Sequence, residues 1–284
     1  MRKRLRSLAF RLLGRRRVYS LLMRLRPRSV HFSEIDLLEE HFAGIRGQGV
    51  MIDVGARHGE SLMACQCRGW RIIAFEPDPA NRAVLADKVD PRFVEIVPMA
   101  VSDHDAAAEP FFASPESDGV SSLTAFLASH REVARVPVTT LATALSGRSG
   151  ETVDYLKIDT EGHDYFVLKG FPWDRFRPSV VACEFDDRKT VPLGYRYQDL
   201  GDYLVARGYE VFLSEWAPIE RYGDVHSWRS WREYPCALQD ANGWGNFLAF
   251  NPGTDLRRVR KYVARFESRN SHAQMPIRVA GAPR

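Results

Sequence analysis

Short apolar runs alternate with amphipathic segments along most of this chain. The apolar runs of strand length are residues 50–54, 71–75, 93–97, 153–158, 179–185, 209–213 and 247–250. Segments with helical spacing lie between them at residues 33–45, 60–67, 81–89, 163–168 and 197–207. Strands that alternate with helices at this spacing predict an α/β fold, in which helices cover both faces of a mostly parallel sheet.

The turn after the first apolar run is the most distinctive local feature. Asp53 comes near the end of that run, and Gly55 and Gly59 lie in the loop that leads into the next helical segment. Glycine permits a tight turn and close approach of a ligand, and a helix N-terminus offers unpaired N–H groups. Arg57 stands where a dinucleotide-binding motif has its middle glycine, so a pyrophosphate ligand is disfavoured. A packing turn without any ligand is the alternative.

Polar side chains also follow several later strands. They are Glu76, Ser102, Asp103, Asp159, Glu161 and Glu184. In open α/β sheets, ligands bind at the edge formed by the carboxyl ends of the strands. An acidic edge favours a ligand that carries a ribose and a positive charge, and S-adenosylmethionine has both. Glu76 would accept hydrogen bonds from the ribose hydroxyls, and Asp53 would attract the ammonium group.

The order of these motifs resembles the FkbM family of S-adenosylmethionine-dependent methyltransferases. The similar segments are residues 52–59, Phe75-Glu76-Pro77, residues 100–103 and the Lys-Ile-Asp-Thr-Glu-Gly-His run at 157–163, which is the most specific. The resemblance spans residues 33 to 250. It implies a class I methyltransferase (Rossmann-like) sheet of seven strands with an antiparallel last strand, and methyl transfer to an oxygen. Thr140-Leu141-Ala142 departs from the family, which usually has Leu-Asp there.

Together, the motifs identify two groups of site residues. The expected cofactor-binding residues are Asp53, Gly55, Ala56, Gly59, Glu76, Pro77, Ala100, Val101, Ser102 and Asp103. The candidates for a catalytic base or an acceptor contact are Asp159, Glu161 and His163. Histidine is the side chain most easily tuned near neutral pH, whereas Glu161 has an alternative role as a helix cap.

A divalent metal is a further hypothesis for the same edge. Its oxygen and nitrogen ligands would come from Asp159, Glu161, His163, Glu184 and Asp186, and oxygen ligands suit Mg²⁺. Their spacing is not a recognised metal signature, so no metal is predicted.

Charge divides the chain into three segments. Residues 1–28 contain eleven basic and no acidic residues, and residues 255–284 contain eight basic and two acidic ones. The remaining 21 basic and 34 acidic residues give residues 29–254 a net charge of −13. We therefore expect a basic amphipathic N-terminal arm, a methyltransferase domain over 29–254 and a basic C-terminal tail.

The arm is suited to lie as a helix on an anionic membrane surface. A flexible or domain-packed basic arm and an organellar transit peptide are alternatives. Its longest uncharged run, residues 18–23, is too short for a membrane span. Nucleic-acid binding is disfavoured because the domain contains no matching basic or aromatic motif.

The four cysteines show neither zinc-like spacing nor a dense disulfide framework, which favours a reducing, cytoplasmic setting, with peripheral attachment at the inner face of a membrane as an option. Residues 214–245 form an aromatic-rich insertion that could either line the acceptor pocket or pack as a lid.

The predicted function is O-methylation of a sugar, a lipid-linked glycan or a secondary metabolite, with S-adenosylmethionine as the cofactor. Two alternatives are a nucleotide-dependent oxidoreductase of similar fold and a catalytically silent, membrane-associated binding module. The oxidoreductase is disfavoured by Arg57.

Overall fold

The computed structural model describes residues 30–44, 49–148, 151–220 and 226–273. The N-terminal arm predicted at residues 1–28 lies outside these ranges. No helix within the described ranges is long and apolar enough to cross a lipid bilayer.

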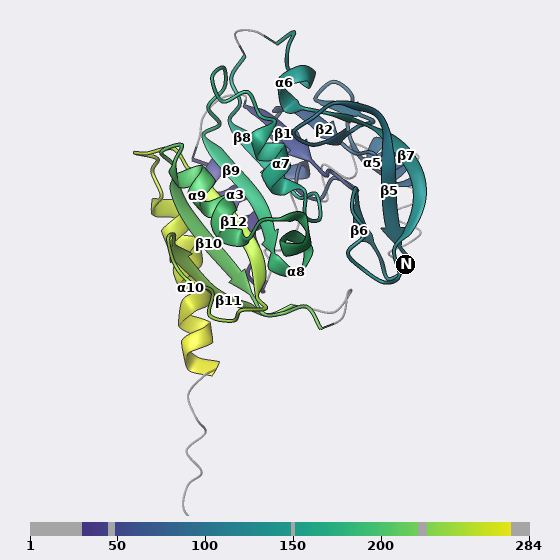
Figure 1. Cartoon of the computed structure of the whole chain (residues 1–284). Helices are drawn as coiled ribbons and strands as arrows, with labels where there is room; N and C mark the ends of the chain where they lie inside the picture. Colours follow the sequence, from purple (N-terminus) through teal and green to yellow (C-terminus); the bar gives the residue numbers. More distant parts are fainter. Residues whose placement is uncertain (1–29, 45–48, 149–150, 221–225, 274–284) are drawn as a thin grey trace, which may run out of the picture.

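A central sheet of eight strands organises the chain (Figure 1). Its strand order is β11-β10-β12-β9-β8-β1-β2-β3. The strands are β1 Val50–Val54, β2 Arg71–Phe75, β3 Val94–Val97, β8 Tyr155–Ile158, β9 Val180–Asp186, β10 Glu210–Trp216, β11 Trp228–Glu233 and β12 Trp244–Phe250. Strands β3, β2, β1, β8 and β9 pair in parallel, and β12 is antiparallel to both of its neighbours. The predicted α/β class and the antiparallel last strand are confirmed.

The sheet has one strand more than the seven predicted. The additional strand, β11, comes from the aromatic-rich segment and pairs antiparallel with the edge strand β10. Its sequence, Trp-Arg-Ser-Trp-Arg-Glu, lacks the alternation of a half-buried strand, because the two tryptophans are three residues apart. An irregularity in the pairing with β10 accompanies this spacing, and both rings pack against the same core.

Helices cover both faces of the sheet. They are α3 Glu34–Phe42, α4 Met63–Cys67, α5 Pro79–Lys88, α6 Leu141–Ala144, α7 Asp164–Lys169, α8 Asp187–Thr190, α9 Tyr197–Val205 and α10 Arg257–Ala273, with a 3-10 helix η1 at Val191–Leu193. Because side chains alternate along a strand, Ile52 packs on one face with α7 and α9, and Met51 packs on the other with α3, α4 and α10. Both residues are fully buried.

A second, smaller sheet stands beside the main one (Figure 1). Its order is β4-β7-β5-β6, with β4 Ala100–Val101, β5 Ala106–Ser114, β6 Ser117–Ser122 and β7 Arg131–Thr139. The serine-rich sequence of residues 114–124 is typical of a loop, but the structure has strand β6 there. Local sequence disfavours a strand in this segment, and pairing with β5 supplies the backbone hydrogen bonds that it needs.

The basic C-terminal segment includes a helix that is part of the folded domain. Val259, Tyr262 and Val263 of α10 are buried in the core that contains α3, and Arg265 forms an ion pair with Glu40 of α3 at 2.5 Å. Arg257, Arg258, Arg260 and Lys261 of the same helix are exposed. A boundary at residue 254 therefore does not coincide with the end of the packed core.

Candidate active site

The glycine turn after β1 brings the ends of β1 and β8 together. Gly55 has φ of +76°, and a Cβ atom there would lie 1.9 Å from the Asp159 carbonyl oxygen. Gly59 also has a positive φ, but its neighbour is the Leu85 side chain of α5, so it serves packing. The helix predicted to start at residue 60 begins three residues later, at Met63, because the chain continues to turn after Gly59.

The Glu76 carboxylate is fixed by backbone N–H groups. It accepts hydrogen bonds from the N–H of Arg57 at 2.7 Å and of Asp78 at 2.9 Å, and its residue is only 4% exposed. Burial raises the pKa of Glu76, while these two hydrogen bonds act in the opposite direction. The Glu76 carboxylate at the end of β2 is thus held in one orientation, in part by the turn that follows β1.

This carboxylate lies in the wall of a first cavity of about 80 Å³. The cavity contains eight of the predicted site residues, namely Gly55, Glu76, Pro77, Ala100, Val101, Asp159, Glu161 and His163. Apolar side chains of Val54, Phe75 and Phe111 line it as well. The combination of apolar walls and one oriented carboxylate suits an aromatic base joined to a ribose.

The other predicted cofactor residues lie elsewhere. Ser102 and Asp103 line neither this cavity nor the second cavity described below, because β4 pairs with β7 and turns the following residues towards α7. The Asp103 carboxylate forms an ion pair there with Lys169 at 2.8 Å. Ala56 is buried in the wall of the second cavity.

Asp53 lies beneath the turn, where it is fully buried. Its Oδ2 accepts a hydrogen bond from Ser61 Oγ at 2.6 Å, and its Oδ1 lies 3.1 Å from Lys157 Nζ. The Lys157 ammonium also donates to the Gly55 carbonyl oxygen at 2.7 Å. Burial lowers the pKa of Lys157, but the carboxylates of Asp53 and Asp159 raise it by more. The buried ion pair of Asp53 and Lys157 therefore stabilises the glycine turn.

A second cavity of about 320 Å³ lies on the face of the sheet that α3 covers. Gly55, Arg57 and Asp159 line both cavities, so they form a shared wall. The outer part of the second cavity contains Trp244 and Asn246 of β12.

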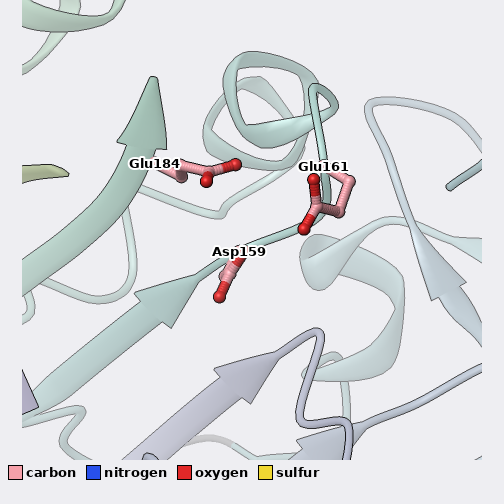
Figure 2. A group of neighbouring side chains, drawn as sticks. All are labelled: Asp159, Glu161 and Glu184. Atoms are coloured by element: carbon pink, nitrogen blue, oxygen red, sulfur yellow. The ribbon is translucent and has the colours of Figure 1, made fainter. Parts of the chain in front are cut away.

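Three of the acidic residues converge at the ends of β8 and β9 (Figure 2). Asp159, Glu161 and Glu184 each place a carboxylate oxygen within 4.8 Å of the others. The buried ammonium of Lys189 already pairs with Glu161 at 2.6 Å and with Glu184 at 2.9 Å. A lysine ammonium therefore provides the positive charge that a metal ion would bring to these two carboxylates.

Glu161 is held in an unusual backbone conformation. Its φ is +55°, and it is one of two non-glycine residues with a positive φ in the described part of the chain. Burial raises the pKa of its carboxyl to about 7, although the Lys189 ammonium opposes this shift. Backbone strain of this kind costs roughly 1–3 kcal/mol and concentrates at functional sites.

His163 lies at the start of α7 and lines the first cavity. Burial lowers its pKa to about 4, so the imidazole is neutral at pH 7. Its Nδ1 is buried and has no hydrogen-bond partner among the described residues. A neutral imidazole with one unpaired nitrogen can orient a ligand or accept a proton.

The aromatic-rich insertion is mainly a packing element. Trp228 stacks on Phe32 with ring centroids 4.1 Å apart, and Trp231 stacks on Phe212 at 5.3 Å. Trp244 differs, because it lines the second cavity. Trp228 and Trp231 thus fit the interpretation of this segment as a packed element, whereas Trp244 fits its interpretation as a pocket lining.

Sequence reasoning missed Lys189 and Ser122. Ser122 lines the first cavity and donates a hydrogen bond to the Glu161 carbonyl oxygen at 3.0 Å. Neither residue lies in a recognisable motif, and only the fold brings them to the run at 157–163. A lysine three residues beyond the acidic end of β9 was the one available signal.

More than half of the chain matches the profile of a known protein family. The profile of the methyltransferase FkbM domain matches residues 53–211, which is more than half of the 284 residues. No curated protein matches the sequence.

Two of the solved structures that match are methyltransferases by name. A precorrin-6y C5,15-methyltransferase from Geobacter metallireducens GS-15 is 15% identical, with 76% of this chain and 86% of that chain covered and a TM-score of 0.39. An rRNA methylase from Streptococcus thermophilus is 9% identical, with 78% and 99% covered and a TM-score of 0.41. From the profile match, the chain belongs to the FkbM methyltransferase domain family.

Proposed function

We propose that this protein is an S-adenosylmethionine-dependent O-methyltransferase that acts on a hydroxyl of a sugar, a lipid-linked glycan or a secondary metabolite. The supporting observation is the Glu76 carboxylate, which two backbone N–H groups orient at the wall of a cavity that Phe75 and Val101 also line. A carboxylate with this placement accepts hydrogen bonds from a ribose diol.

The residues of the first cavity fit the nucleoside part of the cofactor. Phe75 and Val101 offer apolar surface for the adenine, and Glu76 offers the acceptor for the ribose. At about 80 Å³ the cavity is smaller than a typical whole-ligand site of about 300–1,000 Å³. We therefore assign only the nucleoside to it, with the remainder of the cofactor directed towards the shared wall.

The acceptor hydroxyl needs a base. S-adenosylmethionine supplies a methyl group on a sulfonium, and the acceptor oxygen displaces S-adenosylhomocysteine as a neutral thioether while losing its proton. Asp159 is the best-placed proton acceptor, because it lines both cavities and its side chain is 45% exposed. Glu161 is paired with Lys189, and of the two cavities His163 lines only the first.

The experiment is to measure release of S-adenosylhomocysteine from S-adenosylmethionine with a panel of methyl glycosides as acceptors. Asp159→Asn should lower kcat by about 10²–10⁴-fold, the usual contribution of a general base. Its affinity for S-adenosylhomocysteine should remain within about twofold of wild type by calorimetry, because a carboxamide keeps the shape of the wall.

Asp255→Asn is the matched control, since Asp255 pairs with Arg257 at the surface, outside both cavities. It should leave turnover and cofactor affinity unchanged. Normal turnover by Asp159→Asn would remove Asp159 from the mechanism, and absence of turnover by the wild-type protein with every glycoside would count against the proposed acceptor.

A further inference from the structure

We propose that the second cavity is the acceptor site and that it takes a neutral polyhydroxyl ring, such as a glycosyl unit. This inference rests on the proposed function and adds the location and the chemistry of the acceptor.

The position of the second cavity supports an acceptor role. It shares Gly55, Arg57 and Asp159 with the first cavity, so ligands in the two cavities would meet at this wall. Its volume of about 320 Å³ lies within the range of small-molecule sites. Methyl transfer requires the acceptor oxygen to contact the methyl carbon directly, so the acceptor hydroxyl would approach the methyl group where the two cavities adjoin, beside the Asp159 carboxylate.

The charges around this cavity select against an anionic acceptor. Four carboxyl side chains line it, from Glu34, Glu60, Asp159 and Glu184, against two cationic ones, from Arg57 and Lys157. The Lys157 ammonium is engaged with Asp53 and the Gly55 carbonyl oxygen, while Glu60 pairs with Lys88 and Glu184 with Lys189. A phosphorylated or carboxylated ring would therefore find little net positive charge, whereas hydroxyl groups can donate hydrogen bonds to the carboxylates.

Trp244 supplies a rigid aromatic surface in the same cavity. Its indole Nε1 donates to the Ala217 carbonyl oxygen at 2.9 Å, and its ring stacks on Trp216 with centroids 5.9 Å apart. Indole rings combine apolar area with little conformational freedom, which suits contact with the C–H face of a sugar. Asn246 stands two residues further along β12 and adds amide groups.

Another occupant is conceivable on the same geometry, namely the amino-acid end of the cofactor. Glu60 and Glu184 would repel its carboxylate but attract its ammonium, so the preference for a glycosyl unit rests on the Trp244 surface. The two occupants can be separated by measuring cofactor and glycoside binding independently.

The experiment uses the full chain labelled with ¹⁵N-tryptophan, saturated with S-adenosylhomocysteine and titrated with methyl glycosides. The chain contains six tryptophans, and the indole signals of Trp244 and Trp231 are assigned from Trp244→Phe and Trp231→Phe. The Trp244 indole signal should shift on addition of glycoside. Trp231 lies on β11, which β10 separates from β12, and lines neither cavity, so its signal should not move.

Substitution gives the second readout. Trp244→Ala should weaken glycoside binding about tenfold, as expected for the loss of one aromatic contact. Trp244→Ala should leave the affinity for S-adenosylhomocysteine unchanged. Trp231→Ala should change neither the affinity for the glycoside nor the affinity for S-adenosylhomocysteine.

Three other outcomes would contradict, respectively, the occupant of the second cavity, the acceptor site and the proposed function. Loss of S-adenosylhomocysteine binding in Trp244→Ala, with Trp231→Ala normal, would show that the cavity holds the cofactor. A wild-type protein that binds S-adenosylhomocysteine but whose Trp244 signal responds to no glycoside would overturn the acceptor site alone. Failure of the wild-type protein to bind S-adenosylhomocysteine would overturn the proposed function itself.

Discussion

The two halves of the active-site edge hold their acidic groups in different ways. Between β1 and β2, the backbone N–H groups of Arg57, in the glycine turn, and of Asp78 hold the Glu76 carboxylate. Between β8 and β9, lysine side chains hold the acids, and Lys189 pairs with both Glu161 and Glu184 from within α8. The first arrangement is set by backbone geometry, and the second depends on charge balance between side chains.

This difference has a physical consequence. A backbone donor cannot lose its proton, so the orientation of Glu76 should be insensitive to pH wherever the carboxylate is ionised. The second half contains two buried carboxyl groups and one ammonium, and burial raises the pKa of both acids. Its charge state should therefore change within a few pH units of neutrality, and its stability should depend on Lys189.

The largest expected effect comes from removing that ammonium. Lys189→Met should lower the free energy of unfolding by about 3–5 kcal/mol at pH 8, because it leaves two buried carboxylates without a counter-charge. The deficit should shrink as the pH falls and the carboxyl groups become protonated. Urea denaturation at pH 8 and at pH 5 measures both quantities.

Lys169→Met is the matched control, because Lys169 pairs with Asp103 and both side chains are partly exposed. We expect it to cost less than about 1 kcal/mol, as is usual for a surface ion pair. Equal costs for the two lysines would contradict the distinction between the two halves of the site.

A smaller effect concerns the pH dependence of Glu161. Its folded pKa of about 7 lies above the ordinary value of 4.5, so the folded state binds the proton more tightly. Its stabilising contribution is complete below about pH 4.5 and is lost as the pH rises through about 7. Relative to Glu161→Gln, the wild-type protein should therefore lose at most about 1 kcal/mol per pH unit across this window.

His163 contributes with the opposite sign, because its folded pKa of about 4 lies below the ordinary value of 6.5. Its contribution is present above pH 6.5 and is lost as the pH falls through about 4. His163 is present in both the wild-type protein and Glu161→Gln, so its contribution cancels in the difference between their free energies of unfolding. Parallel stability curves for wild type and Glu161→Gln between pH 4.5 and 7 would show that Glu161 does not titrate there.

The fold was predictable wherever local pattern and tertiary structure agree. Strands β1, β2 and β8 are mostly apolar because both of their faces are covered. The segment that became β6, Ser-Asp-Gly-Val-Ser-Ser, has little intrinsic strand preference, and it is a strand only because β5 lies beside it. Strand β11 was missed for a related reason, since its tryptophans can either pack on a sheet or bind a ligand.

The candidate site also divides into residues that local sequence could predict and residues that only the fold brings together. Gly55 and Glu76 were identified from the sequence because a turn needs glycine and a strand end presents its acid at the sheet edge. Lys189 could not be identified from the sequence, since its partner Glu161 is 28 residues away and only the folded structure brings the two together. Ser102 and Asp103 were expected beside the cofactor, but the pairing of β4 with β7 directs them away from both cavities. Membership of the FkbM methyltransferase family sets aside the oxidoreductase alternative.

The most direct test of the central claim, that Glu76 marks the nucleoside site, is a calorimetric titration of S-adenosylhomocysteine into wild type, Glu76→Gln and Glu95→Gln. Glu95 is an exposed carboxylate on β3 that pairs with Arg148 and lines neither cavity. We predict that Glu76→Gln weakens binding about 100-fold, as for loss of a charged hydrogen-bond acceptor, and that Glu95→Gln binds like wild type. Equal affinity in wild type and Glu76→Gln would contradict the assignment.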